Sequence, residues 1–193
     1  MKGIFRMNVI KRGIAAIFDF LQGIVVFLAV IVMVYLFLFS PQEINGASME
    51  PSFFNAELII TNKFIYKVTP PVRGDVVIFK SPRNKDIDYI KRVIGVPGDR
   101  VKLSNNAYYI NDVKLDEPYL RPNTQISGGS YLHEGVEITV PEGYYFVSGD
   151  NRPHSSDSRE FGPIPLEDFI GKGILLYWPA NRFSRIVNPT YGV

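Results

Sequence analysis

The sequence predicts a mainly β protein with a single membrane-spanning helix near its N-terminus. One observation is the apolar segment "GIVVFLAVIVMVYLFLF" at 23–39, which contains no charged residue and no proline. Extended to 18–40, it would form a helix about as long as the roughly 30 Å hydrocarbon thickness of a bilayer. The other observation is that short runs of β-branched and aromatic residues alternate with Gly, Pro, Asn and Asp after residue 40. That alternation is typical of strands and turns.

The N-terminal part predicts an anchor with a defined orientation. Four basic residues precede the apolar segment: Lys2, Arg6, Lys11 and Arg12. Because basic flanks are retained in the cytoplasm, we expect residues 1–14 to form a cytoplasmic tail and 15–40 to form the transmembrane helix. Residues 41–193 would then form an extracytoplasmic domain at the cell membrane. Two alternatives stay open: a cleaved secretory signal with a poor small-x-small site at Asn45 and Ala47, and a buried helix of a soluble core, which usually shows a polar face.

The remainder of the chain predicts one β-rich domain. Eight segments match the strand pattern: 57–62, 74–80, 88–96, 99–103, 107–112, 135–140, 143–149 and 172–178. Asn105 and Asn106 tolerate positive φ and predict a tight hairpin turn. The segment 165–170 has room for one helical turn. Turn-forming residues are densest at 121–135, which we therefore expect to be an exposed, mobile excursion rather than core.

Composition excludes several kinds of chemistry. The 193 residues include no cysteine and only two histidines, His133 and His154. Disulfides and thiolate catalysis are therefore excluded, and a metal site would have to rely on carboxylates. The 21 Lys and Arg residues nearly balance the 19 Asp and Glu residues, which leaves no broad cationic face for nucleic acid. We expect no metal, no cofactor and no nucleic-acid partner.

Ser48 follows the predicted anchor closely, within "INGASMEPSF" at 44–53. An extended chain covers at most about 3.6 Å per residue, so Ser48 stays within roughly 30 Å of the bilayer edge if Ser40 ends the anchor. A serine hydroxyl becomes a good nucleophile only when a neighbouring base takes its proton. The usual bases are histidine and a desolvated lysine.

His154 is one candidate base. It lies near Asp150 and Asp157 in the sequence, so a Ser-His-Asp triad is conceivable. A histidine in a polar loop, however, is more often simply exposed to solvent.

Lys91 is the other candidate base. Strand alternation places it in one row with Tyr89 and Val93, whereas Arg92 points the other way. Burial in such an apolar row lowers the pKa of a lysine, ordinarily about 10.4, by as much as 3 to 5 units. The alternative is a solvated strand lysine that lies over its neighbours and keeps its ordinary pKa.

Four motifs follow the anchor in order: "SMEPS" at 48–52, "RGDVVIF" at 73–79, "KRVIGVPGD" at 91–99 and "GDNRPHSSDSREFG" at 149–162. Together they resemble the successive sequence boxes of type I signal peptidases, and the compact size and single anchor are similar to the Gram-positive members. The resemblance runs from the anchor to near Trp178. It implies a β-rich signal-peptidase catalytic fold. It also implies a membrane-bound serine endopeptidase that removes signal peptides from secreted preproteins after small-x-small sites.

The resemblance implies a role for five residues. Ser48 would be the nucleophile and Lys91 the general base, and Ser155 would support catalysis by a hydrogen bond to the lysine. Asp157 and Arg159 would form a structural ion pair near the site. The implied partners are the signal peptides of preproteins, the lipid bilayer and the secretion translocase.

The family pattern further suggests that four residues line shallow apolar substrate pockets: Ile44, Met49, Tyr89 and Ile90. Residues 103–148 would be a short variable insert between the lysine motif and the last motif. Gly46 stands where some members carry a serine that serves the oxyanion hole, so the second oxyanion donor stays open. The competing function is a catalytically silent, membrane-tethered β module that binds exported chains without cutting them.

Overall fold

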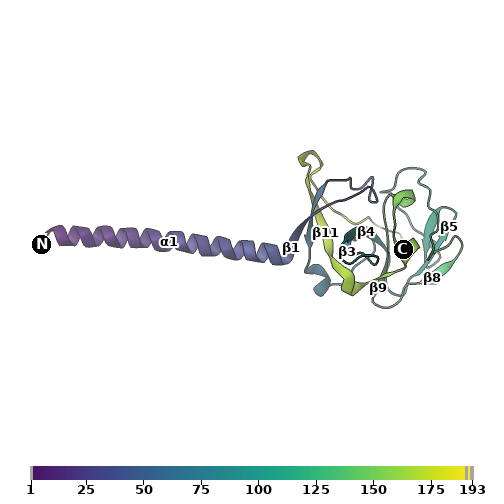
Figure 1. Ribbon diagram of the computed structural model, residues 1–193, viewed down its shortest axis with the longest axis horizontal. Coiled ribbons are helices and arrows are strands. Elements are labelled where there is room, and N and C mark those ends of the chain that lie inside the picture. The colour runs from purple at the N-terminus through teal and green to yellow at the C-terminus, as the bar shows by residue number, and fades with distance from the viewer. Residues whose placement is uncertain (1, 190, 192–193) are drawn as a thin grey trace. The chain divides into compact units, whose positions relative to one another are not determined.

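Figure 1 shows the computed structural model of the chain, which describes residues 2–189 and 191. The chain divides into a helical unit that ends at Leu38 and a β-rich unit that begins at Phe39. This division agrees with the fold class that the sequence predicts, an N-terminal apolar helix followed by antiparallel sheets.

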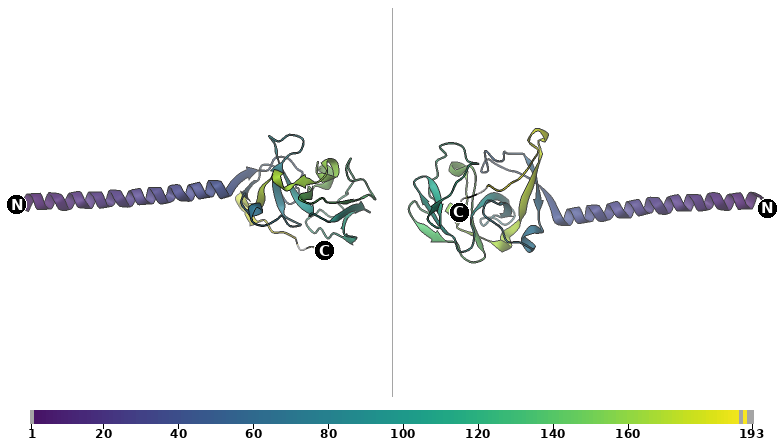
Figure 2. Two further views of the ribbon diagram at one scale, coloured as in Figure 1. Left: turned by 90° about the horizontal axis from the view of Figure 1, so that it is seen from below. Right: turned by 180° about the vertical axis from the view of Figure 1, so that it is seen from behind.

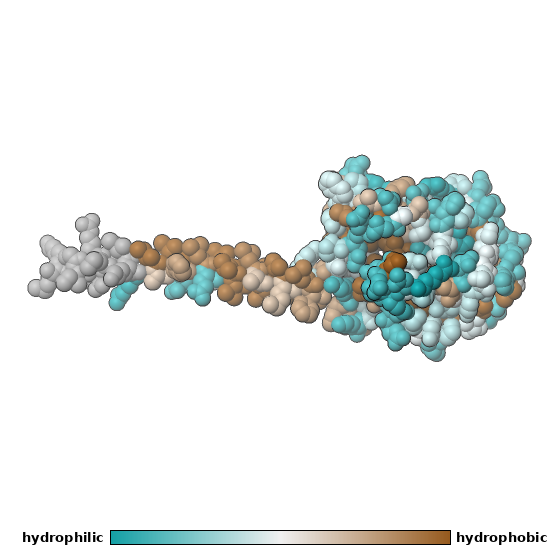
Figure 3. Space-filling model, viewed as in Figure 1, coloured by the Kyte–Doolittle hydropathy of each residue, from teal (hydrophilic) through white to brown (hydrophobic). Residues whose placement is uncertain are grey.

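The helix α1 spans Lys2–Leu38, so it already includes most of the predicted tail. Its segment Arg12–Leu38, 27 residues, is long and apolar enough to cross a membrane. At 1.5 Å per residue this segment is about 40 Å long. Figure 3 shows apolar side chains along the described surface of α1. The helix ends two residues before the predicted boundary at 40, because Phe39 and Ser40 already pair with the next strand.

The larger sheet has eight strands in the order β1-β2-β11-β3-β4-β9-β10, with β12 paired to β11. Its strands are β1 (Phe39–Glu43), β2 (Leu58–Asn62), β3 (Val76–Lys80), β4 (Asp88–Gly95), β9 (Tyr144–Ser148), β10 (Ile164–Pro165), β11 (Phe169–Trp178) and β12 (Ser184–Arg185). All the pairings are antiparallel. A strand from near the C-terminus, β11, therefore separates β2 from β3 in the sheet.

The smaller sheet has four strands in the order β7-β6-β5-β8. They are β5 (Arg100–Ser104), β6 (Ala107–Ile110), β7 (Val113–Lys114) and β8 (Glu137–Thr139). Figures 1 and 2 show this sheet beside the larger one within the β-rich unit. The predicted insert at 103–148 includes β6, β7 and β8 and parts of β5 and β9.

Short helical turns connect the strands. The helix α2 spans Ser158–Phe161. The 3-10 turns span Ile65–Lys67, Arg152–His154, Leu166–Asp168 and Ala180–Arg182. The third of these is the helical turn predicted at 165–170.

Each of the eight predicted strand segments contains a strand, and the predicted hairpin is present. Asn105 and Asn106 have φ values of 50° and 63°, and they connect the paired residues Ser104 and Ala107. Four strands were not predicted: β1, β7, β10 and β12. They have two to five residues, and β1 and β10 contain proline, which sheets accept mainly at their edges.

The prediction that 121–135 is an excursion rather than core is wrong for part of this segment. Ile126 and Leu132 are buried and pack in one cluster with Tyr108 and Phe146. The burial of these two apolar residues was missed because they are isolated in a polar, turn-rich sequence and therefore show no strand or helix period.

The larger sheet is buried on both faces. Along β3, Val76 and Ile78 pack in one cluster, whereas Val77 and Phe79 pack in the other. Since successive side chains of a strand point to opposite faces, two layers of core must cover the sheet. The loop from 44 to 57 supplies part of the first layer through Ile44.

Candidate active site

Ser48 lies in the loop between β1 and β2. The base of this loop is closed by two backbone hydrogen bonds, from Ile44 N to Glu57 O and from Ala56 N to Ile44 O, both 2.8 Å long. Asn55 Oδ1 accepts a further hydrogen bond of 2.7 Å from Gly46 N. The buried side chain of Ile44 anchors the loop in the core, so the position of the serine is fixed from both ends.

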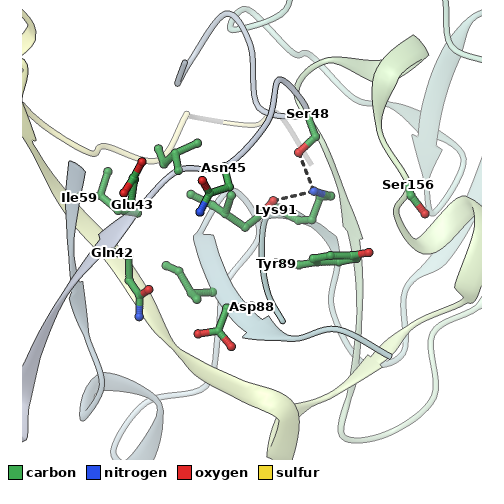
Figure 4. A pocket seen from close by; sticks show the side chains of 12 residues that line it. Gln42, Glu43, Asn45, Ser48, Ile59, Asp88, Tyr89, Lys91 and Ser156 are labelled. Carbon is green, nitrogen blue, oxygen red and sulfur yellow. Dashed lines mark hydrogen bonds between the residues drawn. The ribbon is translucent and has the colours of Figure 1, made fainter. Parts of the chain in front are cut away.

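Lys91 lies on β4 and contacts this serine. Its Nζ donates one hydrogen bond of 2.8 Å to Ser48 Oγ and another of 2.8 Å to Ile90 O. The residue is only 4% exposed, and Nζ lies 5.3 Å from the ring centroid of Tyr89. Figure 4 shows the two hydrogen bonds at the edge of a cavity.

Burial lowers the pKa of Lys91 to about 8, although the negative charges of Asp157 and Asp150 oppose the shift. Desolvation disfavours the ammonium form, whereas nearby carboxylates favour it. An appreciable fraction of the amine is therefore neutral at mildly alkaline pH. A neutral amine at 2.8 Å from a hydroxyl oxygen is placed to take its proton.

The strand β4 explains how the lysine reaches the site. It pairs with β3 from Asp88 to Arg92, whereas its pairing with β9 begins only at Arg92. The other edge of 88–91 therefore carries no strand among the described residues. This leaves Lys91 beside an open edge instead of inside a continuous ladder.

Arg92 points away from Lys91 but is equally buried, which the sequence did not indicate. Its guanidinium pairs with Asp150 at 2.7 Å and donates to Gly74 O at 3.0 Å. The partners are far apart in the sequence. The recurring Gly-Asp pair at Gly74 and Gly149 is the signal that could have pointed to them.

A cavity of about 220 Å³ lies beside the Ser48–Lys91 pair. Three of the four predicted pocket residues line it, namely Ile44, Tyr89 and Ile90. Met49 does not: it is fully buried and packs in the core with Ile44. Figure 4 labels further lining residues that sequence reasoning missed: Gln42, Glu43, Asn45, Ile59, Asp88 and Ser156.

The loop after β9 packs directly on Ser48. Asn151 N donates to Ser48 O and Asn151 Nδ2 donates to Ala47 O, both at 3.0 Å. A Cβ on Gly149 would overlap with the Ser48 carbonyl oxygen and with Ser155 Oγ. Glycine at 149 therefore permits a close approach of the two loops that any other residue would prevent.

Asp157 and Arg159 form an ion pair of 2.8 Å within the same loop. Burial alone would raise the pKa of Asp157, but hydrogen bonds and charge from Arg159 lower it below its ordinary value. The carboxylate also accepts hydrogen bonds of 3.0 Å from Gly149 N and Ser148 Oγ. The pair thus fixes the part of the loop that packs on Ser48.

Two other candidate residues, Ser155 and His154, do not make the contacts that were considered for them. Ser155 Oγ is buried but makes no hydrogen bond to Lys91, so the expected support of the lysine is not made here. His154 is exposed, and among the described residues the hydrogen bond to Ser48 Oγ comes from Lys91. The geometry thus favours the lysine over the histidine as the base.

No group of three His, Asp or Glu side chains in the described part of the chain could hold a metal.

Comparison with known proteins places this arrangement in a family. The family model "Signal peptidase, peptidase S26" matches residues 17–178. The chain is 42% identical over 162 residues to a signal peptidase I of Bacillus caldolyticus, covering 80% of this chain and 88% of that protein. It is 36% identical over 184 residues to a signal peptidase IB of Staphylococcus aureus strain COL, covering 90% and 95%.

Among solved structures, a crystal structure of a signal peptidase I from Enterococcus faecalis V583 is 36% identical. The match covers 54% of this chain and 97% of that chain, with a TM-score of 0.46. The family model and the two relatives cover most of the chain at substantial identity. The chain therefore belongs to the signal peptidase family of serine peptidases, peptidase S26.

Proposed function

We propose that this protein is a membrane-bound serine endopeptidase that removes signal peptides from secreted preproteins, with Ser48 as nucleophile and Lys91 as general base. The observation that carries the proposal is the 2.8 Å contact between Lys91 Nζ and Ser48 Oγ. The lowered pKa of this buried lysine, about 8, supports it.

The reaction follows from this contact. The neutral Lys91 amine takes the proton of Ser48 as Oγ attacks the carbonyl carbon before the scissile bond, and the ammonium then gives that proton to the leaving amine. Water next attacks the ester on Ser48 and gives a proton to Lys91, which returns it to Ser48 Oγ as the acid product leaves. The Ser48 backbone N–H makes no hydrogen bond to any described residue, so it is free to stabilise the oxyanion.

The second oxyanion donor is not Gly46 N–H, which already donates to Asn55 Oδ1. Gly46 also has a φ of +93°, a conformation that a serine would adopt only with strain. Serine at this position, as in some members of the family, would therefore require a different loop conformation. Support of Lys91 by Ser155 remains a proposal that requires a shift of the Ser155 side chain.

Substrate recognition by strand addition is supported by the open edge of β4 at 88–91 and by β1 at the end of the larger sheet. An extended substrate could pair with these backbones in a way that does not depend on its sequence. Alternate side chains would then enter the cavity, whose apolar wall includes Ile44, Tyr89 and Ile90. A small apolar cavity favours small side chains such as alanine one and three positions before the cut.

The membrane part of the proposal depends on α1. Arg12–Leu38 can cross a bilayer, and the basic residues before it favour a cytoplasmic N-terminus with the β-rich unit outside. Ser48 follows Leu38 by only ten residues, which keeps the nucleophile near the membrane. Preproteins, bilayer lipids and the secretion translocase would meet the enzyme there.

The test is cleavage of a preprotein by the full-length protein in detergent. Wild type should release the mature chain after a small-x-small site, and Ser48→Ala and Lys91→Ala should each abolish turnover. The double variant should be no worse than either, because members of one catalytic unit are not additive. His154→Ala should cleave nearly as fast as wild type. Binding of the preprotein without cleavage by wild type would instead identify a silent binding module.

A further inference from the structure

The Ser156 hydroxyl is a feature of the cavity that the proposed reaction does not use. Its Oγ is buried and has no hydrogen-bond partner among the described residues. It nevertheless lines the same cavity as Ser48 and Lys91. Buried hydroxyl groups in proteins are almost always hydrogen-bonded, because an unpaired one is costly. Because Ser156 lines the cavity, a group that enters the cavity can supply the missing partner.

The backbone on both sides of Ser156 is held in place. Arg159 donates to Ser155 O at 3.3 Å, and the Asp157 carboxylate accepts from Gly149 N at 3.0 Å. Ser156 lies between these two fixed residues, so its Cα cannot move far from the cavity wall. Only rotation about its side-chain bond remains free, and that rotation can direct the hydroxyl to a bound group.

The cavity wall combines apolar and polar side chains. Figure 4 shows it on the side of Tyr89 that faces away from Gln42 and Glu43. Four isoleucines complete much of the wall: Ile44, Ile59, Ile78 and Ile90. An apolar wall selects a substrate side chain by size and cannot compensate a hydroxyl for the water that it loses. A hydroxyl next to the apolar part of the wall, such as that of Ser156, can.

We propose that Ser156 is a specificity-determining residue, whose hydroxyl hydrogen-bonds the side-chain hydroxyl of a serine immediately before the scissile bond. The inference rests on the proposed function, which places the scissile carbonyl at Ser48 Oγ. The side chain nearest to the reacting carbonyl belongs to that residue of the substrate. Serine and alanine are similar in size, so the apolar wall admits both. The Ser156 hydroxyl distinguishes them. When alanine is bound, a water molecule takes the place of the substrate hydroxyl as its partner.

The first experiment compares three preproteins that differ only in having alanine, serine or glycine before the cut. The ratio of kcat/KM for the serine substrate to that for the alanine substrate should fall about tenfold in Ser156→Ala, because a buried substrate hydroxyl loses its partner. The ratio of glycine to alanine should stay constant, since neither side chain carries a hydroxyl.

Thr61→Val is the matched control. Thr61 Oγ1 is also buried without a partner among the described residues, but Thr61 lies on β2 and does not line the cavity. Its removal should leave the serine-to-alanine ratio as in wild type. An equal fall of the ratio in both variants would overturn the assignment of Ser156, because the effect would then be general.

A second experiment separates this inference from the proposed function. Peptides that span the cleavage site, with serine or alanine before the cut, are titrated into Ser48→Ala and into Ser48→Ala with Ser156→Ala. The serine peptide should lose about tenfold in affinity relative to the alanine peptide when the Ser156 hydroxyl is absent. An unchanged ratio rejects the role of Ser156 even if wild type cleaves. Absence of cleavage by wild type together with the expected loss of affinity rejects the proposed function alone.

Discussion

At the scale of single residues, the basicity of Lys91 reflects a balance between burial and two carboxylates. Burial lowers its pKa, whereas Asp157 and Asp150 raise it. Each carboxylate is itself paired with an arginine, Arg159 and Arg92 respectively. Burial outweighs the two carboxylates, so the pKa of the amine is about 8 instead of about 10.4.

This balance predicts the pH dependence of cleavage. In the proposed mechanism only the neutral Lys91 amine acts as base, so kcat/KM should rise with pH and level off above the pKa of Lys91 of about 8. Roughly a tenth of the enzyme is active at pH 7 on this basis. The measurement is a pH–rate profile of wild type beside His154→Ala, which should show the same rising limb. A limb near 6.5 that disappears in His154→Ala would assign the reaction to the histidine.

Asp157 predicts a pH dependence of stability. Its pKa in the folded protein is lowered mainly by Arg159, so the stabilisation is fully present above its unfolded pKa of about 3.9. It is lost as the pH falls through the folded pKa. Asp157→Asn leaves Arg159 without its partner and should cost about 3 to 5 kcal/mol at pH 7.

The free energy of unfolding of the full-length protein in detergent, measured with denaturant at several pH values, tests this prediction. The difference between wild type and Asp157→Asn should narrow as the pH falls below about 4. Asp112→Asn, in an exposed pair with Arg100, is the control and should change stability little at any pH. A difference that stays constant with pH would show that the Asp157 charge is not responsible.

Single residues also show where prediction from the sequence succeeds and where it fails. Strand alternation placed Lys91 in an apolar row and made burial one of two interpretations, and the ordered set of motifs then favoured the buried lysine. The burial of Arg92 with Asp150 was not predictable in this way, since the pattern of one strand contains no information about a partner 58 residues away. Ser156 was missed for a similar reason, because a serine in a polar loop shows no sign that its hydroxyl faces a cavity.

At the scale of elements, the connection between β7 and β8 of the smaller sheet supports the loop that packs on Ser48. The fully buried Arg152 pairs with Glu117, which follows β7, and donates to Gly149 O at 2.8 Å. Tyr131 N donates to Arg159 O at 2.8 Å. Residues of the expected variable insert therefore contact the loop that packs on Ser48 and hold it in place. The sequence did not reveal this role, because each contact joins segments that are distant along the chain.

Glu117→Ala tests this support. It leaves the buried Arg152 without its carboxylate, which should cost about 3 to 5 kcal/mol in the free energy of unfolding. It should also lower kcat more than it raises KM, since the loop carries catalytic geometry rather than the apolar cavity wall. Asp168→Ala breaks an exposed ion pair with Lys85 and should cost less than about 1 kcal/mol. Equal effects of the two variants on stability and on kcat would contradict the proposed support.

At the scale of the whole molecule, the sequence predicted the fold class, an apolar helix followed by antiparallel sheets, because helix and strands obey different physical rules. A long uncharged apolar segment predicts a membrane helix almost by length alone, and periodic short segments predict strands. The order of the strands in the larger sheet could not be predicted from such local patterns. The position of β11 between β2 and β3 depends on packing that no local pattern contains.

The proposed orientation of α1 predicts which parts of the chain an external protease can reach. A protease added to intact cells should cut the exposed loop at 121–125 but spare a tag fused before Lys2, because the proposal places the N-terminus in the cytoplasm. Immunoblots for the N-terminal tag and for a C-terminal tag measure the two outcomes. Permeabilised cells serve as the control, in which the N-terminal tag should also be lost. Its loss from intact cells would reverse the orientation.

The position of β11 in the larger sheet has a consequence for when the enzyme becomes active. The strands β1 and β2 flank the loop with Ser48, and β3 and β4 carry Lys91, but the two pairs meet in the sheet only through β11. A chain emerging from synthesis therefore contains both reacting side chains long before they can meet. Phe169–Trp178 must be complete and inserted first, and such non-local pairing is slow. Late addition of β11 to the sheet would therefore delay assembly of the proposed Ser48–Lys91 pair until almost the whole chain has been synthesised.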